Sequence, residues 1–206
     1  MTNTLHRKGT NEELKGDFVL FALPKGPIPD LINKLIKFTN ICLKHKPVNM
    51  GKVVNRSLRR IDPRKMEEEM KKSLGLTATF NDINKLAAII AELKEADLGI
   101  SINVSGLFKE VQNGCKKAGM SRHSVEHSLG IFGKKEKLPP LPILQMNTLC
   151  GHGLVSFNLI KKIVDEVKLG RMTPEDGAHH MAKPCECGAF NPSRAKELIE
   201  SMLMMG

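Results

Sequence analysis

The chain of 206 residues contains no tryptophan, no tyrosine and only eight phenylalanines. Proteins that bind single-stranded nucleic acid stack the bases on aromatic side chains, so we expect no such surface. No apolar run reaches the roughly 18–20 residues that a membrane-spanning helix needs, and we expect no membrane contact. The opening residues, MTNTLHRKGTNEELKGD, lack the apolar centre of a secretory signal. The expected location is therefore cytoplasmic.

Several familiar motifs are also absent. Neither Gly-x-Gly-x-x-Gly nor the Walker pattern occurs, so a nucleotide-binding loop of a common kind is not predicted. No two cysteines have Cys-x-x-Cys spacing, the commonest pattern in zinc and iron–sulfur sites. Two weaker candidates for anion binding remain. One is VSG at 104–106, at a predicted strand-to-helix turn that presents backbone N–H groups, and the other is HRKG at 6–9.

At 41% hydrophobic residues the chain can bury a substantial core. The pattern predicts an α+β or α/β fold, predominantly helical, with a small sheet that includes a strand–helix–strand unit at 99–131. The expected strands are 17–23, 99–104 and 123–131, with mixed or parallel pairing across a right-handed crossover. We expect a mixed α/β core over 1–137 and a helical part with Cys/His loops over 138–206, packed as one compact domain.

Apolar spacing and capping residues predict the helices. They cover 30–46, 62–75, 81–99, 105–118, 155–170, 173–183 and 191–203. Proline in the first turn supports three of them, with Asp62, Thr173 and Asn191 as the caps. The proline-rich segment 133–149 is interpreted as a connection.

The net charge of +10 is unevenly distributed. Residues 150–206 contain seven basic and seven acidic side chains, so the excess lies in 1–149. The segment 44–65 has eight Lys/Arg against one acid, Asp62, which is typical of either an anion-binding surface or a solvated loop. The candidate anion-binding residues are Arg56, Arg59, Arg60 and Arg64. A nucleic-acid-binding module that uses this segment is therefore one hypothesis for function.

Cysteine and histidine cluster in the last third of the chain, in CGHG (150–153) and HHMAKPCECGAF (179–190). Each cysteine loop is predicted to precede a helix N-terminus, whose N–H groups and dipole stabilise thiolates. Cys150, His152, Cys185 and Cys187 supply three sulfurs and one imidazole, a ligand set typical of tetrahedral zinc. The sequence thus predicts a metal-binding protein that holds zinc or an iron–sulfur cluster.

Other interpretations of the same residues stay open. Cys150 with a histidine base, or Cys185 with Cys187 as a dithiol, would suit a thiol or redox enzyme without metal. The adjacent His179 and His180 point about 100° apart on a helix, so that at most one is expected beside the cysteines, as ligand, base or outer hydrogen-bond partner.

Cys42 and Cys115 lie on apolar stripes and are predicted to be core residues. His123 and His127 are predicted to be packed or surface residues. Enzyme activity, substrate and protein partners are not specified by these patterns.

Overall fold

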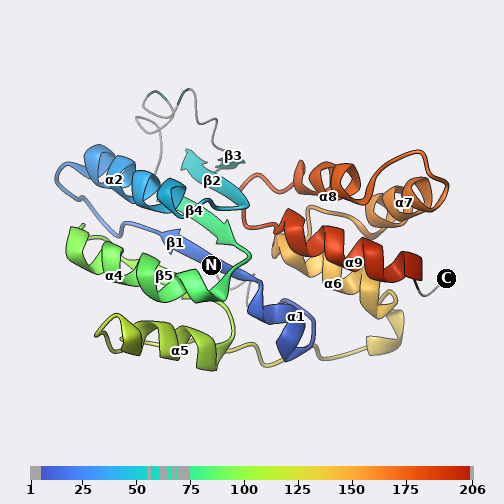
Figure 1. Ribbon diagram of the computed structural model, residues 1–206, viewed down its shortest axis with the longest axis horizontal. Coiled ribbons are helices and arrows are strands. Elements are labelled where there is room, and N and C mark those ends of the chain that lie inside the picture. Colours follow the sequence, from blue (N-terminus) through green and yellow to red (C-terminus); the bar gives the residue numbers. More distant parts are fainter. Residues whose placement is uncertain (1–5, 55–56, 61–64, 66–67, 69–74, 205–206) are drawn as a thin grey trace.

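The computed structural model describes residues 6–54, 57–60, 65, 68 and 75–204, and Figure 1 shows their arrangement. The elements are, in chain order, α1 (Asn11–Lys15), β1 (Phe18–Ala22), α2 (Leu31–Lys44), β2 (Asn49–Val54), β3 (Ser57–Arg60), β4 (Gly75–Phe80), η3 (Ile83–Lys85), α4 (Leu86–Ala96), β5 (Ile102–Ser105), α5 (Phe108–Lys117), η4 (Lys135–Lys137), α6 (Leu141–Cys150), α7 (Phe157–Lys168), α8 (Pro174–Ala182) and α9 (Pro192–Met204). The predicted α+β fold, predominantly helical with a small sheet, is confirmed.

The strands form one sheet in the order β3-β2-β4-β1-β5. Every pairing among the described strands is antiparallel. β1 has a neighbour on each side, with Leu20 opposite Ala78 of β4 and opposite Val104 of β5. β5 is therefore an edge strand, which pairs with β1 alone among the strands described.

Two layers of helices cover the two faces of β1, because successive strand residues point to opposite sides. Phe18 and Leu20 belong to a core that includes residues of α2 and α4. Val19 and Phe21 belong to a second core, built mainly from α6 to α9 and the loops between them. Figure 1 shows those four helices grouped on one side of the molecule. Helices α6 to α9 thus pack directly on the sheet.

The predicted strand at 123–131 is wrong, and so is the parallel pairing that depended on it. The segment has no regular structure, and both Val125 and Leu129 are exposed. The alternating apolar residues of this segment have no core to pack against, because helices already cover both faces of β1. The helix between the two expected strands does form, as α5.

The interpretation of 133–149 as a connection is wrong for its second half, which forms α6. Its sequence, LPILQMNTLC, lacks an amphipathic stripe because the helix is buried on most sides, as Ile143, Met146 and Leu149 show. The three helices that follow are confirmed. Thr173 caps α8 by accepting a hydrogen bond from the backbone N–H of Asp176, and Asn191 Oδ1 accepts one from the N–H of Arg194 in α9.

Of the helices in the described part of the chain, none combines the length and the apolar composition that a membrane span requires.

Candidate metal centre

Four residues far apart in the sequence meet where the end of α6 lies beside the loop between α8 and α9. The Sγ atoms of Cys185 and Cys187 are 3.6 Å apart, and Cys187 Sγ lies 3.7 Å from His152 Nδ1. The thiols of Cys150 and Cys185 are hydrogen-bonded to each other. All four residues predicted to be metal ligands are therefore in one group, here called the cysteine–histidine cluster.

The cluster is buried at its sulfurs and open at its imidazole. Cys150, Cys185 and Cys187 are at most 2% exposed and belong to the core formed by the C-terminal helices. His152 lies in an exposed turn between Gly151 and Gly153, which have φ values of 73° and 72°. Glycine adopts this left-handed backbone at little cost, so the two glycines let the chain turn sharply after α6 and bring the imidazole back to Cys187.

Backbone N–H groups point at all three sulfurs. The N–H of Phe190 donates to Cys185 Sγ at 3.3 Å. The nearby N–H groups of His152 and Leu154 act to lower the pKa of Cys150, against the larger effects that raise it, and that of Ala189 acts to lower the pKa of Cys187. Hydrogen bonds of this kind stabilise negative charge on sulfur and are typical of metal-bound thiolates.

One detail of the prediction is wrong. Cys150 does not precede a helix N-terminus but is the last residue of α6, and α7 begins only at Phe157. A helix C-terminus carries the negative end of the dipole, which disfavours a thiolate. At this position the backbone N–H groups of His152 and Leu154 provide the stabilisation that had been attributed to the dipole.

The three thiols differ in acidity. The hydrogen bond with Cys185, followed by burial, raises the pKa of Cys150 well above its ordinary value. The bond with Cys150 lowers the pKa of Cys185, but the bond with Cys187 and burial outweigh it and raise that pKa to about 12. The bond donated by Cys185 lowers the pKa of Cys187. Of the three thiols, Cys187 is the one whose pKa is lowered.

The loop that carries Cys185 and Cys187 is fixed to the sheet by hydrogen bonds. Thr77 Oγ1 donates to the carbonyl of Cys187, and Thr79 Oγ1 donates to that of Gly188 at 2.8 Å. Asn49 Nδ2 donates to the carbonyl of Phe190 at 2.9 Å. These donors lie on the neighbouring strands β2 and β4, so the sheet sets the position of two sulfurs.

Two glycines allow this close approach. A Cβ atom on Gly51 of β2 would overlap the carbonyl of Cys187, and a Cβ atom on Gly188 would overlap the backbone of Met50 and Gly51. Gly188 has in addition a φ of 73°, which disfavours any residue with a side chain. The loop and β2 therefore pack backbone against backbone.

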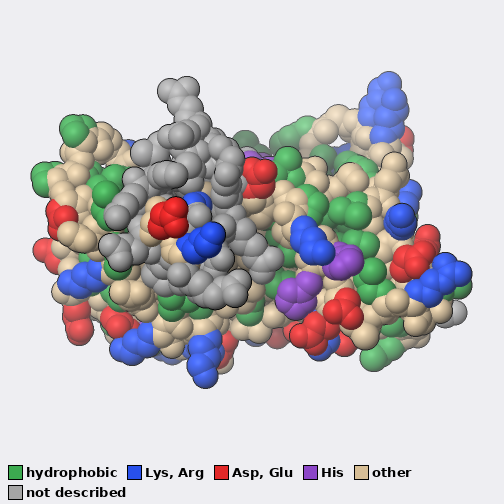
Figure 2. All heavy atoms as spheres, turned by 90° about the horizontal axis from the view of Figure 1, so that it is seen from above, with side chains coloured by type: hydrophobic (Ala, Val, Ile, Leu, Met, Phe, Trp, Pro, Cys, Tyr) green, Lys and Arg blue, Asp and Glu red, His purple; other side chains and the backbone are tan. Residues whose placement is uncertain are grey.

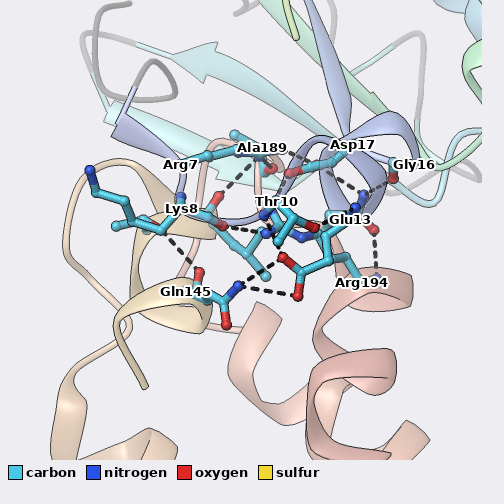
Figure 3. A network of polar contacts seen from close by, with 12 residues as sticks. Arg7, Lys8, Thr10, Glu13, Gly16, Asp17, Gln145, Ala189 and Arg194 are labelled. Atoms are coloured by element: carbon cyan, nitrogen blue, oxygen red, sulfur yellow. Dashed lines mark hydrogen bonds and ion pairs between the residues drawn. The ribbon is translucent and has the colours of Figure 1, made fainter. Parts of the chain in front are cut away.

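Arg7 connects both halves of the cluster (Figure 3). Its guanidinium donates to the carbonyl of Leu149, next to Cys150, at 3.1 Å and to the carbonyl of Ala189, two residues after Cys187. It also pairs with the carboxylate of Asp17. The positive charge of Arg7 helps to lower the pKa of Cys187. Arg7 thus connects the two cysteine-bearing segments through hydrogen bonds to a carbonyl of each.

The carboxylate of Asp17, fully buried, is the centre of the network in Figure 3. Arg194 Nη1 donates to Oδ2 at 2.9 Å, and Asn191 Nδ2 donates to Oδ1 at 3.0 Å. Arg194 also donates to the carbonyl of Lys8. A buried charge is tolerated when it is paired and hydrogen-bonded, and here the arrangement fixes Arg7 and the start of α9 around one acid.

Sequence reasoning missed this network. Arg7 was assigned to a candidate anion-binding arm, and Asp17 and Arg194 were given no role. The one available signal was Asn191, which the Asn-Pro pattern identified as a helix cap and whose amide also reaches Asp17.

The residues of the cluster fit zinc in kind and in pairwise spacing. With bond lengths of about 2.3 Å to sulfur and 2.0–2.1 Å to nitrogen, a tetrahedral site has edges of about 3.8 Å between sulfurs and about 3.6 Å between sulfur and nitrogen. The two measured spacings, 3.6 Å and 3.7 Å, are close to these edges. In the described part of the chain, however, no three His, Cys, Asp and Glu side chains already form a group that could hold a metal ion. The contacts are pairwise, so binding would require the side chains to rotate towards a common point.

The remaining histidines lie elsewhere. His179 and His180 are exposed on α8; Nδ1 of His179 hydrogen-bonds with the carbonyl of Glu175 at 2.8 Å, and His180 lines a surface pocket with Lys162 and Pro184. Figure 2 shows histidines on the surface over the C-terminal helices, among charged side chains. The described contacts thus connect neither histidine to the cysteines, and the outer-partner role predicted for them has no contact to support it.

The other candidate residues are placed as follows. Cys42 is fully buried and Cys115 is partly buried against the core of α2 and α4. His123 and His127 are exposed, and the ring of His127 lies 5.3 Å from that of Phe108. Arg59 and Arg60 belong to β3. Arg56, Arg64 and nearly all of the predicted helix 62–75 lie outside the described residues.

Comparison of the chain with protein-family models, with curated proteins and with solved structures finds no match in any of the three.

Proposed function

We propose that the protein binds one zinc ion through Cys150, Cys185 and Cys187, with His152 as the fourth ligand. The observation that carries this proposal is that Cys187 Sγ lies 3.6 Å from Cys185 Sγ and 3.7 Å from His152 Nδ1, both close to the edges of a zinc tetrahedron, while Cys150 is buried in the same core. The N–H groups directed at the sulfurs support it, because they favour the deprotonated thiols that zinc requires.

The same geometry favours a single ion over an iron–sulfur cluster. In a four-iron cluster each cysteine binds a different iron atom, so the sulfides keep the cysteine sulfurs apart; a two-iron cluster takes four cysteines, or two cysteines and two histidines, and not three cysteines and one histidine. Cys185 and Cys187 have sulfurs 3.6 Å apart, a spacing that suits two ligands of one ion. A four-iron cluster on these residues would require the sulfurs of Cys185 and Cys187 to move apart within their loop.

The proposed role of the ion is to brace two loops, because its ligands come from the turn after α6 and from the loop between α8 and α9. Four protein ligands would close the site, as in structural zinc sites. The exposed position of His152 makes it the ligand that exchanges most readily. We further propose a reducing compartment, the cytoplasm, as the working location, because a metal-binding set of thiols must stay free of disulfides.

Metal analysis of the full chain, purified anaerobically from cells grown without added metal, tests the proposal. We expect about one zinc per chain, and loss of most of it in Cys185→Ser and Cys187→Ser. Cys115→Ser is the matched control, because Cys115 lies in the other core, and it should keep its metal. Absence of stoichiometric metal in the unmodified chain would overturn the proposal.

The same preparation distinguishes the rival hypotheses. If the preparation contains iron and has a broad absorption band at about 400 nm, these residues hold an iron–sulfur cluster and not zinc. A metal-free chain whose number of titratable thiols falls reversibly with mild peroxide would indicate a thiol or redox enzyme. Binding to nucleic acid that weakens steeply with salt would support the hypothesis based on residues 44–65.

A further inference from the structure

A cavity of about 820 Å³ lies along the outer edge of β5, on the side of β1 away from β4. It is bounded by the end of α4, by the first turns of α5 and by the segment 120–128. Apolar side chains, among them Leu93, Phe108 and Val111, line part of its wall. Cavities of this size, with apolar walls and a few convergent polar groups, are where small molecules bind.

The edge of β5 contributes backbone groups to this cavity. The N–H of Leu23 donates to the carbonyl of Ser101, and Phe21 is opposite Asn103. Backbone groups of an antiparallel strand point alternately to either side, so those of Ser101 and Asn103 face β1. The N–H and carbonyl groups of Ile102 and Val104 therefore point outward, where the structure describes no strand to pair with them.

The N-terminus of α5 opens onto the same space. Gly106, Leu107 and Phe108 line the cavity, and no side chain caps the helix at Leu107. The first N–H groups of a helix have no partner within the helix and carry the positive end of its dipole. This is the turn that the VSG pattern had indicated as a candidate for anion binding.

Two arginines that line the cavity have buried nitrogens without a hydrogen-bond partner among the described residues, Nη1 of Arg122 and Nε of Arg7. The guanidinium of Arg122 lies 4.1 Å from the centre of the ring of Phe108, the first residue of α5. The side chain of Arg7 is only 6% exposed. Buried donors normally have a partner; within the described part of the chain Arg194 Nε lacks one as well but does not line the cavity, so the nitrogen of Arg122, whose guanidinium lies against Phe108, is the donor relevant to a ligand there.

The acidic residues that line the cavity do not cancel its preference for an anion. Asp97 and Glu126 are exposed, so solvent screens their charge. Asp17 is buried but already receives hydrogen bonds from Arg7, Asn191 and Arg194. The donors that still lack a partner are those of Arg122, of Arg7 and of the first turn of α5.

We propose that this cavity binds a small organic anion. Its phosphate or carboxylate group accepts hydrogen bonds from Arg122 and from the N-terminal N–H groups of α5, and its apolar part packs against Phe108 and Val111. This site is separate from the cysteine–histidine cluster and does not depend on zinc. The two sites share one residue, because Arg7 lines the cavity and also holds the carbonyls of Leu149 and Ala189.

Titration of the ¹⁵N-labelled full chain with phenyl phosphate and with benzoate, followed by NMR, tests the proposal. We expect saturable shifts of the amide signals of Gly106, Leu107 and Phe108 with at least one of the two probes. The probe that binds tighter identifies the anionic group. Inorganic phosphate, which lacks the apolar part, should bind at least about tenfold more weakly than phenyl phosphate.

Two variants make the test specific. Arg122→Gln should weaken binding at least about tenfold, because it removes a charge-assisted hydrogen bond. Leu107→Asp should weaken it similarly, since a carboxylate at the cap position competes for the first N–H groups of α5 while favouring the helix. Arg171→Gln on the surface near α7 is the control with the same change of charge and should bind like the unmodified chain.

Three results would overturn the proposal. They are no saturable shift with either probe, equal weakening in Arg122→Gln and Arg171→Gln, or shifts confined to residues outside the cavity. The metal content of Arg122→Gln should equal that of the unmodified chain, so failure of the cavity proposal and failure of the zinc proposal are separate observations.

Discussion

Arg7 donates a hydrogen bond to the carbonyl of Ala189, across 182 positions of sequence. The same guanidinium holds the carbonyl of Leu149 and the carboxylate of Asp17. The N-terminal arm is thus part of the support of the cysteine–histidine cluster, although it contributes no sulfur or imidazole.

Replacement of Arg7 by methionine should destabilise the fold and weaken metal binding. Asp17 would lose one of its two buried cationic partners, and removal of a partner from a buried ion pair costs about 3 kcal/mol. Urea unfolding should show this loss, and zinc affinity should fall in the same variant. Lys196→Met is the control, because the Lys196–Glu175 pair is exposed and contributes less than about 1 kcal/mol. Equal stability of the two variants would contradict the role of Arg7.

Gly188→Ala should be much more destabilising than Gly170→Ala. Both glycines have similar left-handed backbones, with φ of 73° and 69°, so both variants pay about 1–2 kcal/mol of backbone strain. A Cβ atom at 170 meets nothing within 4 Å, whereas one at 188 overlaps the backbone of β2. We expect an additional loss of at least about 2 kcal/mol in Gly188→Ala by urea unfolding. Similar losses in both would show that the loop does not pack on β2.

Zinc binding at pH 7 should release about two to three protons, because the raised pKa values of Cys150 and Cys185 keep these thiols protonated in the metal-free protein. Affinity should therefore rise as the pH rises from about 6 to about 9. Calorimetric titration in two buffers with different heats of ionisation measures the number of protons. Binding that releases none would show that the thiols are not the ligands.

Glu13→Gln should reduce stability at neutral pH but not in acid. Hydrogen bonding to the N–H of Thr10 lowers the pKa of Glu13 in the folded protein, against burial. Its carboxylate therefore stabilises the fold above the ordinary pKa near 4.5, and this contribution is lost as the pH falls through the lowered value. The side chain is largely exposed, so the effect should stay below about 1 kcal/mol.

Thermal unfolding of both proteins between about pH 3 and 7 measures this difference, which should shrink towards the acid end. Glu12→Gln is the control, because Glu12 is in the same helix and, within the described part of the chain, its ion pair is the exposed one with Lys15. If the difference in unfolding temperature between Glu13→Gln and the unmodified chain increases in acid, the sign of the pKa shift is contradicted.

The helices were predictable where one face is apolar and the ends carry caps. α7 shows this, with Ile160, Ile163, Val164 and Val167 buried on one stripe and Ser156 at its cap. α6 was not predictable by the same means, because burial on most sides leaves no contrast between faces. β4 was missed for a related reason: GLTATF is buried throughout, and its threonines are satisfied by carbonyls of the cysteine loop.

The closeness of Cys185 and Cys187 was predictable from their spacing, since Cys-x-Cys puts two sulfurs within one tight loop. The contacts that hold the candidate ligands in place were not predictable from the sequence. Gly51, Thr77 and Arg7 have roles that depend on carbonyl groups more than a hundred residues away in sequence. No local pattern records which carbonyl a side chain will meet, so these contacts required the three-dimensional structure.

The hydrogen bonds of Arg7 to two distant segments also have a consequence for biosynthesis. Arg7 leaves the ribosome 182 residues before Ala189, and Cys185 and Cys187 emerge with that later segment. The proposed zinc site can therefore form only after the segment through Ala189 has been made, so zinc should bind there only after that point of synthesis.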